Sequence, residues 1–258
     1  MQINQKIPPI IHYCWFGGGK MNFILSKCVS TFHQLIRGGE IICWNESQLP
    51  IIANEYVNKQ IENKEWAFAS DYVRLWALYE YGGIYLDTDI EVKKKLPDSF
   101  FEAEMIIGYS YDNIVCTAFI MVKPRHPFIK YLLEKYDNLT PDKKIVNNGL
   151  FTQALLDYYP NFILDGKYHE FASNTFIYPR DYFDSSTYHA MAGYTVHHGM
   201  GSWKKYECPI LRLLRPMVKF AKFYIKPFAV WYMNRVNKKM VMNSGHFLEI
   251  YKKNISNK

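Results

Sequence analysis

The sequence predicts an α/β fold built on a sheet of the nucleotide-binding type. Two observations lead to this prediction: apolar strand-like runs alternate with helical stretches, and no internal repeat or low-complexity linker interrupts them. The chain has 258 residues, of which 49% are hydrophobic, so it can bury a large core. In such sheets ligands collect at the carboxyl ends of the strands.

The expected elements follow one another through the first 160 residues or so. Each strand is a run of β-branched and aromatic residues that stops at glycine or polar residues, and each helix repeats apolar residues every three or four positions. Three glycines end the first strand, and a glycine pair ends the longest helix. The predicted strands are 7–16, 40–44, 83–92, 105–109 and 115–122, and the predicted helices are 23–35, 63–81, 127–136 and 148–158.

Positive charge is concentrated at the C-terminal end. The formal net charge is +7, and residues 204–258 hold 13 Lys and Arg against two acidic residues. The remaining residues hold 18 basic and 22 acidic side chains. A basic tail on a mildly acidic body predicts a polyanionic partner for the tail. We therefore expect one domain over 1–205 and a basic, aromatic helical extension over 206–258.

The pattern of the tail favours a membrane surface over nucleic acid. Basic side chains recur every three or four residues, and apolar side chains follow beside them with the same period, as in an interfacial helix. No recognised nucleic-acid-binding motif accompanies the charge. The alternative is a helix that packs its apolar face on the domain. The basic residues are Arg212, Arg215, Lys219, Lys222 and Lys226, and the apolar ones are Leu211, Leu214, Val218, Ala221 and Ile225.

The helical stretch from Trp66 to Tyr79 is apolar on nearly every side, which predicts a buried helix. Its two charged residues, Asp71 and Arg74, lie three positions apart and therefore on one face. Burial of a carboxylate and a guanidinium is costly unless they pair or bind a ligand. Two interpretations stay open at this point: a salt bridge with no other role, and a pair that binds a ligand.

Two aspartates follow the next predicted strand. A glycine pair ends the buried helix, the strand I-Y-L comes next, and Asp87 and Asp89 follow directly. Both would project to the same side if the strand continued through them. Two close carboxylates repel each other, and a divalent cation relieves this repulsion. Mg²⁺ or Mn²⁺, held by carboxylates and substrate phosphates, is the expected ion.

Three sequence blocks occur in an order that resembles one known family. The opening block is I-P-P-I-I-H-Y-C-W-F-G-G, the central block is S-D-x-x-R-x-x-x-L-Y-x-x-G-G-I-Y-L-D-x-D, and the closing block is H-H-G-M-G-S-W. They are similar to glycosyltransferase family 32, whose region is named for its D-x-D sugar-binding motif and which is common in bacterial capsule and lipopolysaccharide synthesis. The sequence departs from many relatives at Asn147-Asn148-Gly149, where they carry G-P, and an Asn there is within reach of the donor.

The resemblance implies a Rossmann-like GT-A fold, a nucleotide-sugar donor that is usually UDP-linked, Mn²⁺ or Mg²⁺, and retention of the anomeric configuration. Asp89 matches the main metal ligand, and Asp87 matches a residue that contacts the ribose or sugar and touches the metal through water. Asp71 and Arg74 match the pair that hydrogen-bonds and orients the donor sugar. Trp15 resembles an aromatic residue that stacks on uracil in related toxin glycosyltransferases.

The closing block supplies the remaining expected contacts. His198 lies five residues before Trp203, in the register where related enzymes place a third metal ligand, and His197 is the neighbouring alternative. Imidazole is a common ligand for Mn²⁺-like ions beside carboxylates. Ser202 and Trp203 are expected to close over the diphosphate.

The resemblance and the tail together predict a hexosyltransferase that acts at a membrane. Its expected acceptor is a polyprenyl-linked glycan in capsule, O-antigen or other surface polysaccharide synthesis. The five cysteines are odd in number, widely spaced and without a C-x-x-C pair, which favours a reducing cytosol. We find no signal-peptide pattern and no run of about 18 apolar residues. We therefore expect a cytoplasmic protein that is peripheral on the inner face of the cell membrane. Two other functions stay open: a toxin- or effector-like transferase with a protein acceptor, and a non-catalytic membrane-associated scaffold.

Overall fold

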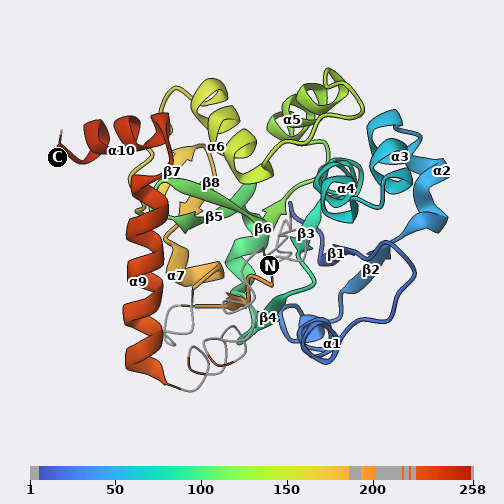
Figure 1. The fold of residues 1–258 in the computed structure, drawn as a ribbon, viewed down its shortest axis with the longest axis horizontal. Helices are drawn as coiled ribbons and strands as arrows, with labels where there is room; N and C mark the ends of the chain where they lie inside the picture. Colours follow the sequence, from blue (N-terminus) through green and yellow to red (C-terminus); the bar gives the residue numbers. More distant parts are fainter. Residues whose placement is uncertain (1–5, 186–192, 201–216, 218–220, 222–224, 257–258) are drawn as a thin grey trace.

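A seven-stranded sheet forms the centre of the protein (Figure 1). The computed structural model describes residues 6–185, 193–200, 217, 221 and 225–256. The strands of the sheet are β1 (Ile10–Cys14), β2 (Glu40–Trp44), β3 (Gly83–Leu86), β5 (Met105–Tyr111), β6 (Ile114–Val122), β7 (His169–Ala172) and β8 (Thr175–Tyr178). A second, two-stranded sheet pairs β4 (Ile90–Val92) with β9 (Thr195–His197).

The strand order of the large sheet is β2-β1-β3-β6-β5-β8-β7. Strands β2, β1, β3, β5 and β8 point in one direction, and β6 and β7 point in the other. The carboxyl ends of five strands therefore meet at one edge, where α/β sheets bind ligands. The α/β fold expected from the sequence is confirmed.

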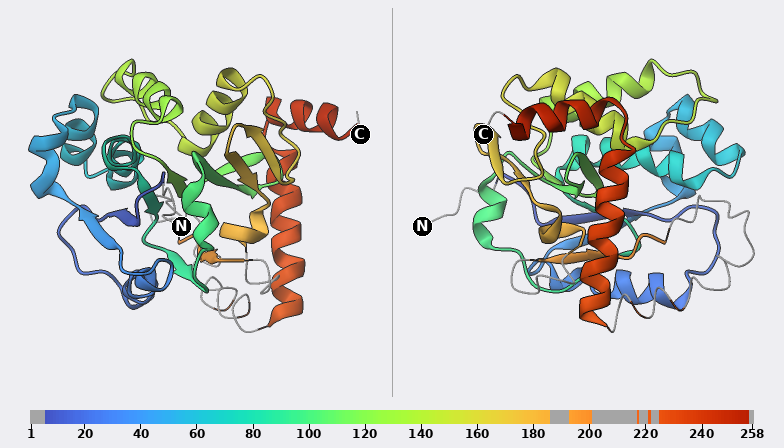
Figure 2. Two further views of the ribbon diagram at one scale, coloured as in Figure 1. Left: turned by 180° about the vertical axis from the view of Figure 1, so that it is seen from behind. Right: turned by 60° about the vertical axis from the view of Figure 1, so that its left-hand side comes forward.

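Helices cover both faces of the sheet, as Figures 1 and 2 show. Side chains alternate along the strands, so Tyr85 packs into the cluster on one face while Ile84 and Leu86 pack into the cluster on the other. On the first face lie α3 (Glu55–Glu62), α4 (Trp66–Tyr81), α5 (Pro127–Asp137) and α6 (Asn147–Tyr158), and on the second lie α1 (Phe23–Ser30) and α7 (Arg180–Phe183). The other helical elements are α2 (Leu49–Ile52), α9 (Lys226–Met242), α10 (His246–Ser256), and the 3-10 turns η1 (Phe32–Gln34), η2 (Glu46–Gln48) and η3 (Asp98–Glu102).

The structure corrects one expected element that bears on the site. The single strand predicted over 83–92 is wrong, because Asp87, Thr88 and Asp89 form a turn that separates β3 from β4. The Ile90 N–H closes this turn by donating to the Asp87 carbonyl at 3.0 Å. The expected strand 40–44 is confirmed as β2, and α9 and α10 lie within the expected helical extension, whereas α2, α3, α7, β7, β8 and β9 were not anticipated.

Two glycines connect the buried helix α4 directly to the central strand β3. Gly82 has φ +65° and Gly83 has φ +100°, and a Cβ on either would lie within about 2.5 Å of backbone atoms of Pro124 or Ile10. The buried His12 completes the turn, because its Nε2 lies 2.8 Å from the Gly82 carbonyl and its Nδ1 accepts from the Trp44 indole at 3.1 Å. This tight connection fixes α4 relative to the end of β3.

The C-terminal helices pack on the body with one face. Met233, Asn237 and Val241 of α9 are buried, and Asn237 Nδ2 donates to Asp112 at 2.7 Å. Phe247 of α10 belongs to the main hydrophobic cluster. This face of α9 packs on the protein, whereas the predicted basic and apolar stripes over 211–226 lie outside the described residues except at positions 221, 225 and 226. Within the described ranges, no helix combines the length and the apolar character needed to cross a membrane.

Candidate active site at the strand ends

The turn that carries Asp87 and Asp89 lies at the carboxyl edge of the sheet, directly after β3. Trp15 follows the parallel neighbour β1 and therefore lies at the same edge. Its N–H donates to the Trp44 carbonyl at 2.8 Å and its indole donates to the Gly19 carbonyl at 2.7 Å. The structure thus brings Trp15 and the two aspartates to neighbouring strand ends, as the sequence predicts.

Arg74 holds two carboxylates on one side of the turn, and we call Asp71, Arg74 and Asp87 the guanidinium cluster. Arg74 Nη2 lies 2.8 Å from Asp71 Oδ1, and Nη1 lies 3.3 Å from Asp87 Oδ1. Nη1 also donates to the Thr117 carbonyl at 2.7 Å, and the guanidinium stacks 4.5 Å over the Tyr85 ring. The buried pair expected on α4 is confirmed, and its guanidinium reaches the first aspartate of the motif.

Asp71 is the less readily ionised member of this cluster. Burial raises the pKa of Asp71 to about 7, even though Arg74 lowers it, and the charge of Asp87 raises it further. Two carboxylates share one guanidinium, which leaves the cluster short of positive charge. Asn147 Nδ2 donates to Asp71 Oδ1 at 2.9 Å, so the first residue of α6 joins the cluster, although sequence reasoning did not include it.

The small sheet brings the closing block to the other side of the turn. Strand β9 pairs antiparallel with β4, with His197 opposite Ile90. His197 Nε2 lies 3.3 Å from Asp89 Oδ1, and Nδ1 lies 3.5 Å from Asp184 Oδ2. We call Asp89, His197 and Asp184 the imidazole cluster. Asp184 follows α7 and was not anticipated, since no motif surrounds it in the sequence.

Charge pairing dominates the ionisation of the imidazole cluster. Burial raises the pKa of Asp89, but the His197 imidazole and the Met200 N–H outweigh it, so the pKa of this carboxyl lies well below its usual value. Burial lowers the pKa of His197, but Asp89 and Asp184 raise it well above its usual value. The imidazole is therefore positively charged while no other cation lies between these carboxylates.

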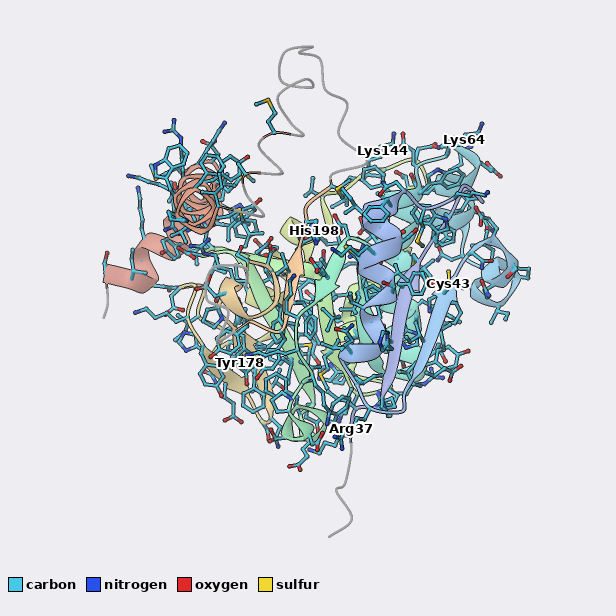
Figure 3. All side chains as sticks on the ribbon, turned by 90° about the horizontal axis from the view of Figure 1, so that it is seen from below. Arg37, Cys43, Lys64, Lys144, Tyr178 and His198 are labelled. Carbon is cyan, nitrogen blue, oxygen red and sulfur yellow. The ribbon has the colours of Figure 1, made fainter. Side chains whose placement is uncertain are left out.

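The neighbouring histidine has a different partner. His198 Nε2 lies 3.0 Å from Glu91 Oε2, and its backbone N–H donates to the Asp89 carbonyl at 3.0 Å. In Figure 3 His198 lies between α9 and the N-terminal strands β1 and β2. The β4–β9 register thus directs the His197 ring toward Asp89 and the His198 ring toward Glu91, and the choice of metal ligand between the two histidines stays a prediction.

Asp87, Asp89 and His197 form a donor set that suits a divalent cation. One ligand atom from each residue lies within 4.8 Å of the other two. Two carboxylate oxygens and an imidazole nitrogen are ligands that Mn²⁺ accepts, and the carboxylates also suit Mg²⁺. The Met200 N–H donates to Asp89 Oδ2 at 2.7 Å and leaves the other oxygen facing His197. The expected contacts Ser202 and Trp203 lie outside the described residues.

The comparisons with known proteins agree with this geometry. The model of a glycosyltransferase sugar-binding region containing DXD motif matches residues 23–111, about a third of the chain. Inositol phosphoceramide mannosyltransferase 1 of Schizosaccharomyces pombe is 30% identical over 148 residues, which cover 48% of this chain and 41% of the yeast protein. Human alpha-1,4-N-acetylglucosaminyltransferase is 32% identical over 80 residues, which cover 31% of this chain and 22% of the human protein.

Among solved structures, the PaToxG glycosyltransferase superposes with a TM-score of 0.47 and 21% identity, over 60% of this chain and 70% of that chain. The chain thus spans less than half the length of the two curated relatives named above.

The family model contains the turn described above. Residues 23–111 are similar to a glycosyltransferase sugar-binding region containing a DXD motif, and Asp87-Thr88-Asp89 is a D-x-D sequence within them. The glycosyltransferase class expected from the sequence is supported by this match and by both named relatives. These relatives come from a fission yeast and from human, so the expected restriction to bacterial capsule or lipopolysaccharide proteins has no support.

Proposed function

We propose that the protein is a metal-dependent, retaining glycosyltransferase of the GT-A type that transfers a hexosyl group from a UDP-linked donor to a glycan acceptor. The observation that carries the proposal is the convergence of Asp87, Asp89 and His197 at the carboxyl edge of the sheet. The DXD family match and the adjacent Asp71–Arg74 pair support it.

Each cluster has a separate role in this reaction. Asp87, Asp89 and His197 would hold Mn²⁺ or Mg²⁺, which neutralises the diphosphate leaving group as its bond to the sugar breaks. Asp71 accepts hydrogen bonds from sugar hydroxyls and stabilises the positive charge that develops on the ring. In this geometry the acceptor attacks from the face that the nucleotide leaves.

Arg74 acts mainly by orienting the two carboxylates. Its Nε donates to the Ser70 carbonyl at 3.2 Å, and its other named contacts are with Thr117, Asp71 and Asp87. Two of these contacts are hydrogen bonds to backbone carbonyls and two are ion pairs, so the protein itself already engages much of the guanidinium. A direct contact of Arg74 with the donor sugar stays a prediction.

Release of nucleoside diphosphate tests the proposal. We expect the full chain to hydrolyse or transfer sugar from one member of a UDP- and GDP-sugar panel only when Mn²⁺ or Mg²⁺ is present. Asp89→Asn should lower this rate about 100- to 1000-fold, as for loss of one transition-state contact. Asp98→Asn is the matched control, since Asp98 pairs with Lys95 at the surface, and it should leave the rate unchanged. Equal rates in EDTA, or an active Asp89→Asn, would contradict metal dependence.

We also propose that the acceptor is a polyprenyl-linked glycan of a surface polysaccharide and that the protein lies on the cytoplasmic face of an anionic membrane. Two observations support this. The face of α9 opposite its buried residues exposes Trp231, Arg235, Lys238 and Lys239, and Arg235 lies 5.5 Å over the Trp231 ring. The yeast relative is named as a mannosyltransferase of inositol phosphoceramide, which is a lipid.

Vesicle binding tests the membrane assignment. We expect the full chain to sediment with phosphatidylserine-containing vesicles and not with neutral ones. Neutralising Lys238 and Lys239 to Gln should weaken binding about fivefold for each lysine, because each contributes about 1 kcal/mol near an anionic surface. Lys130→Gln is the control, because this exposed lysine lies on α5 beside Glu134. Sedimentation unchanged by the α9 variants would contradict this role of α9, and transfer to a protein acceptor would overturn the lipid-linked one.

A further inference from the structure

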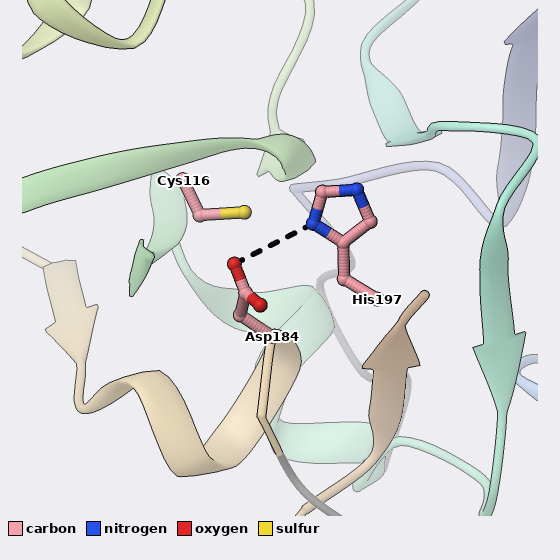
Figure 4. Close-up of side chains that lie close together, drawn as sticks. All are labelled: Cys116, Asp184 and His197. Carbon is pink, nitrogen blue, oxygen red and sulfur yellow. Dashed lines mark ion pairs between the residues drawn. The ribbon is translucent and has the colours of Figure 1, made fainter. Parts of the chain in front are cut away.

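The imidazole of His197 lies between two carboxylates that come from different parts of the fold. Nε2 faces Asp89 in the DXD turn at 3.3 Å, and Nδ1 faces Asp184 at 3.5 Å. Figure 4 shows Asp184 directed at the Nδ1 side of the ring, with Cys116 beside it. The ring nitrogen that faces the proposed ion is therefore Nε2, and Nδ1 faces away from it.

Asp184 is itself held firmly. Its side chain is 8% exposed, and the Ser110 hydroxyl donates to Oδ2 at 2.6 Å. The His197 backbone N–H donates to the Asp184 carbonyl at 2.9 Å, which ties β9 to the end of α7. Ser110 comes from the large sheet, so three elements converge on this carboxylate. A carboxylate anchored at both its side chain and its backbone can direct a neighbouring ring.

We propose that Asp184 is the positioning residue of the metal site: it accepts a hydrogen bond from Nδ1–H of His197 and so directs the Nε2 lone pair at the ion held by Asp87 and Asp89. Metal-binding histidines commonly donate their second N–H to a carboxylate, which fixes both the tautomer and the ring orientation. Closing the 3.5 Å separation by about 0.5 Å gives an ordinary hydrogen bond. This inference rests on the proposed function.

The structure supplies a matched control for this arrangement. Asp165 is also buried and lies 2.7 Å from Nε2 of His169, but this pair belongs to the loop before β7 and to β7 itself. Loss of either aspartate removes a buried Asp–His contact. Only the loss of Asp184 should change how an imidazole faces the DXD turn.

Mn²⁺ binding to the full chain, measured by calorimetry and by electron paramagnetic resonance, tests the proposal. We expect Asp184→Ala to weaken Mn²⁺ affinity 10- to 100-fold, the usual effect of removing an outer partner of a ligand. Asp184→Asn should lose less, because its amide oxygen still accepts from Nδ1–H. Asp165→Ala should lower the melting temperature but leave the affinity unchanged.

Further variants keep the proposal falsifiable if Asp184→Ala does not fold. Ser110→Ala removes only the anchor of Asp184 and should cause a smaller loss of Mn²⁺ affinity. Cys116→Ser should cause none, and a loss equal to that of Asp184→Asn would overturn the proposal by placing the ion on the Nδ1 side of the ring. Wild-type affinity in both Asp184 variants, or an equal loss in Asp165→Ala, would overturn it too.

The same experiment separates the two proposals. If His197→Ala and Asp89→Asn lose Mn²⁺ binding while both Asp184 variants keep it, only the positioning role fails. If the wild-type chain binds no Mn²⁺ at this site, both the metal-dependent function and the positioning role are overturned.

Discussion

Asp87 and Asp89 are separated by one residue, but the two clusters around them hold their charges in opposite ways. In the guanidinium cluster, one cation faces two acids, and the pKa of buried Asp71 is raised to about 7. In the imidazole cluster, the pKa of Asp89 is held well below its usual value by the His197 imidazole. The pKa of His197 is in turn raised by the two carboxylates on either side of it. The first cluster has a permanent cation, and the second has one that a metal ion can replace.

The two clusters therefore differ in whether their cation can be exchanged. Arg74 cannot lose its proton in a protein, so the guanidinium cluster is held together whether or not a ligand is bound. The imidazole of His197 binds either a proton or a metal, because both use its nitrogen lone pair. In the proposed metal site, Arg74 would therefore have the structural role and His197 the ion-binding role.

The largest effect should come from breaking the guanidinium cluster. Arg74→Ala leaves the largely buried carboxylate of Asp71 and the partly exposed one of Asp87 without their cation and should lower the free energy of unfolding by about 3–5 kcal/mol. Urea denaturation measures this change. The control is Arg125→Ala, which removes a guanidinium that is 60% exposed and pairs with Glu80, and it should cost about 0–1 kcal/mol. Similar losses in both variants would show that the buried cluster is not the stabilising frame.

Breaking the imidazole cluster should instead lower the affinity for Mn²⁺. His197→Ala should weaken Mn²⁺ binding by roughly 100-fold. Loss of a ligand should cost at least as much affinity as loss of a residue that only hydrogen-bonds a ligand. His198→Ala, which removes a ring paired with Glu91, should change it much less. Calorimetry at fixed pH compares the two. The reverse order would place the ligand at His198 and would contradict the β4–β9 register as its cause.

A further effect is a pH dependence that belongs to Asp71. Its pKa is raised from 3.8 to about 7 in the folded state, so the folded protein binds more protons at Asp71 than the unfolded chain between these values. The contribution of Asp71 to stability should be full below about pH 4 and fall as pH rises to about 7, by at most about 1.4 kcal/mol per pH unit. Asp71→Asn should remove this component, as measured by urea denaturation across pH in EDTA. An identical slope in the variant would contradict the raised pKa of Asp71.

Local patterns in the sequence predicted part of the fold and of the guanidinium cluster. The charged pair on α4 is three residues apart on a buried helix, and the glycine pair leads directly into β3, so Asp71, Arg74 and Asp87 follow from local rules. The run of 83–92 misled the strand prediction because its apolar residues continue past the motif. Asp and Thr at 87–89 are turn residues, and that signal was available.

The imidazole cluster depends on contacts that local patterns do not determine. The choice between His197 and His198 is set by the register of β9 against β4, which one position of slippage would reverse. Asp184 reaches the ring because the His197 backbone N–H donates to the Asp184 carbonyl and so joins β9 to the end of α7. Asn147 meets Asp71 because α6 packs on β6 and α5, which bring its first residue to α4, although no motif links them.

The small β4–β9 ladder would also determine when the proposed metal site is completed during synthesis. Asp89 follows β3 and His197 lies in β9 near the other end of the described body, so their meeting is a long-range contact whose closure carries an entropic cost. A ribosome-bound chain that has emerged only as far as β8 already contains the DXD motif and its arginine. It becomes competent to retain the ion only after the histidine strand leaves the exit tunnel and pairs with β4.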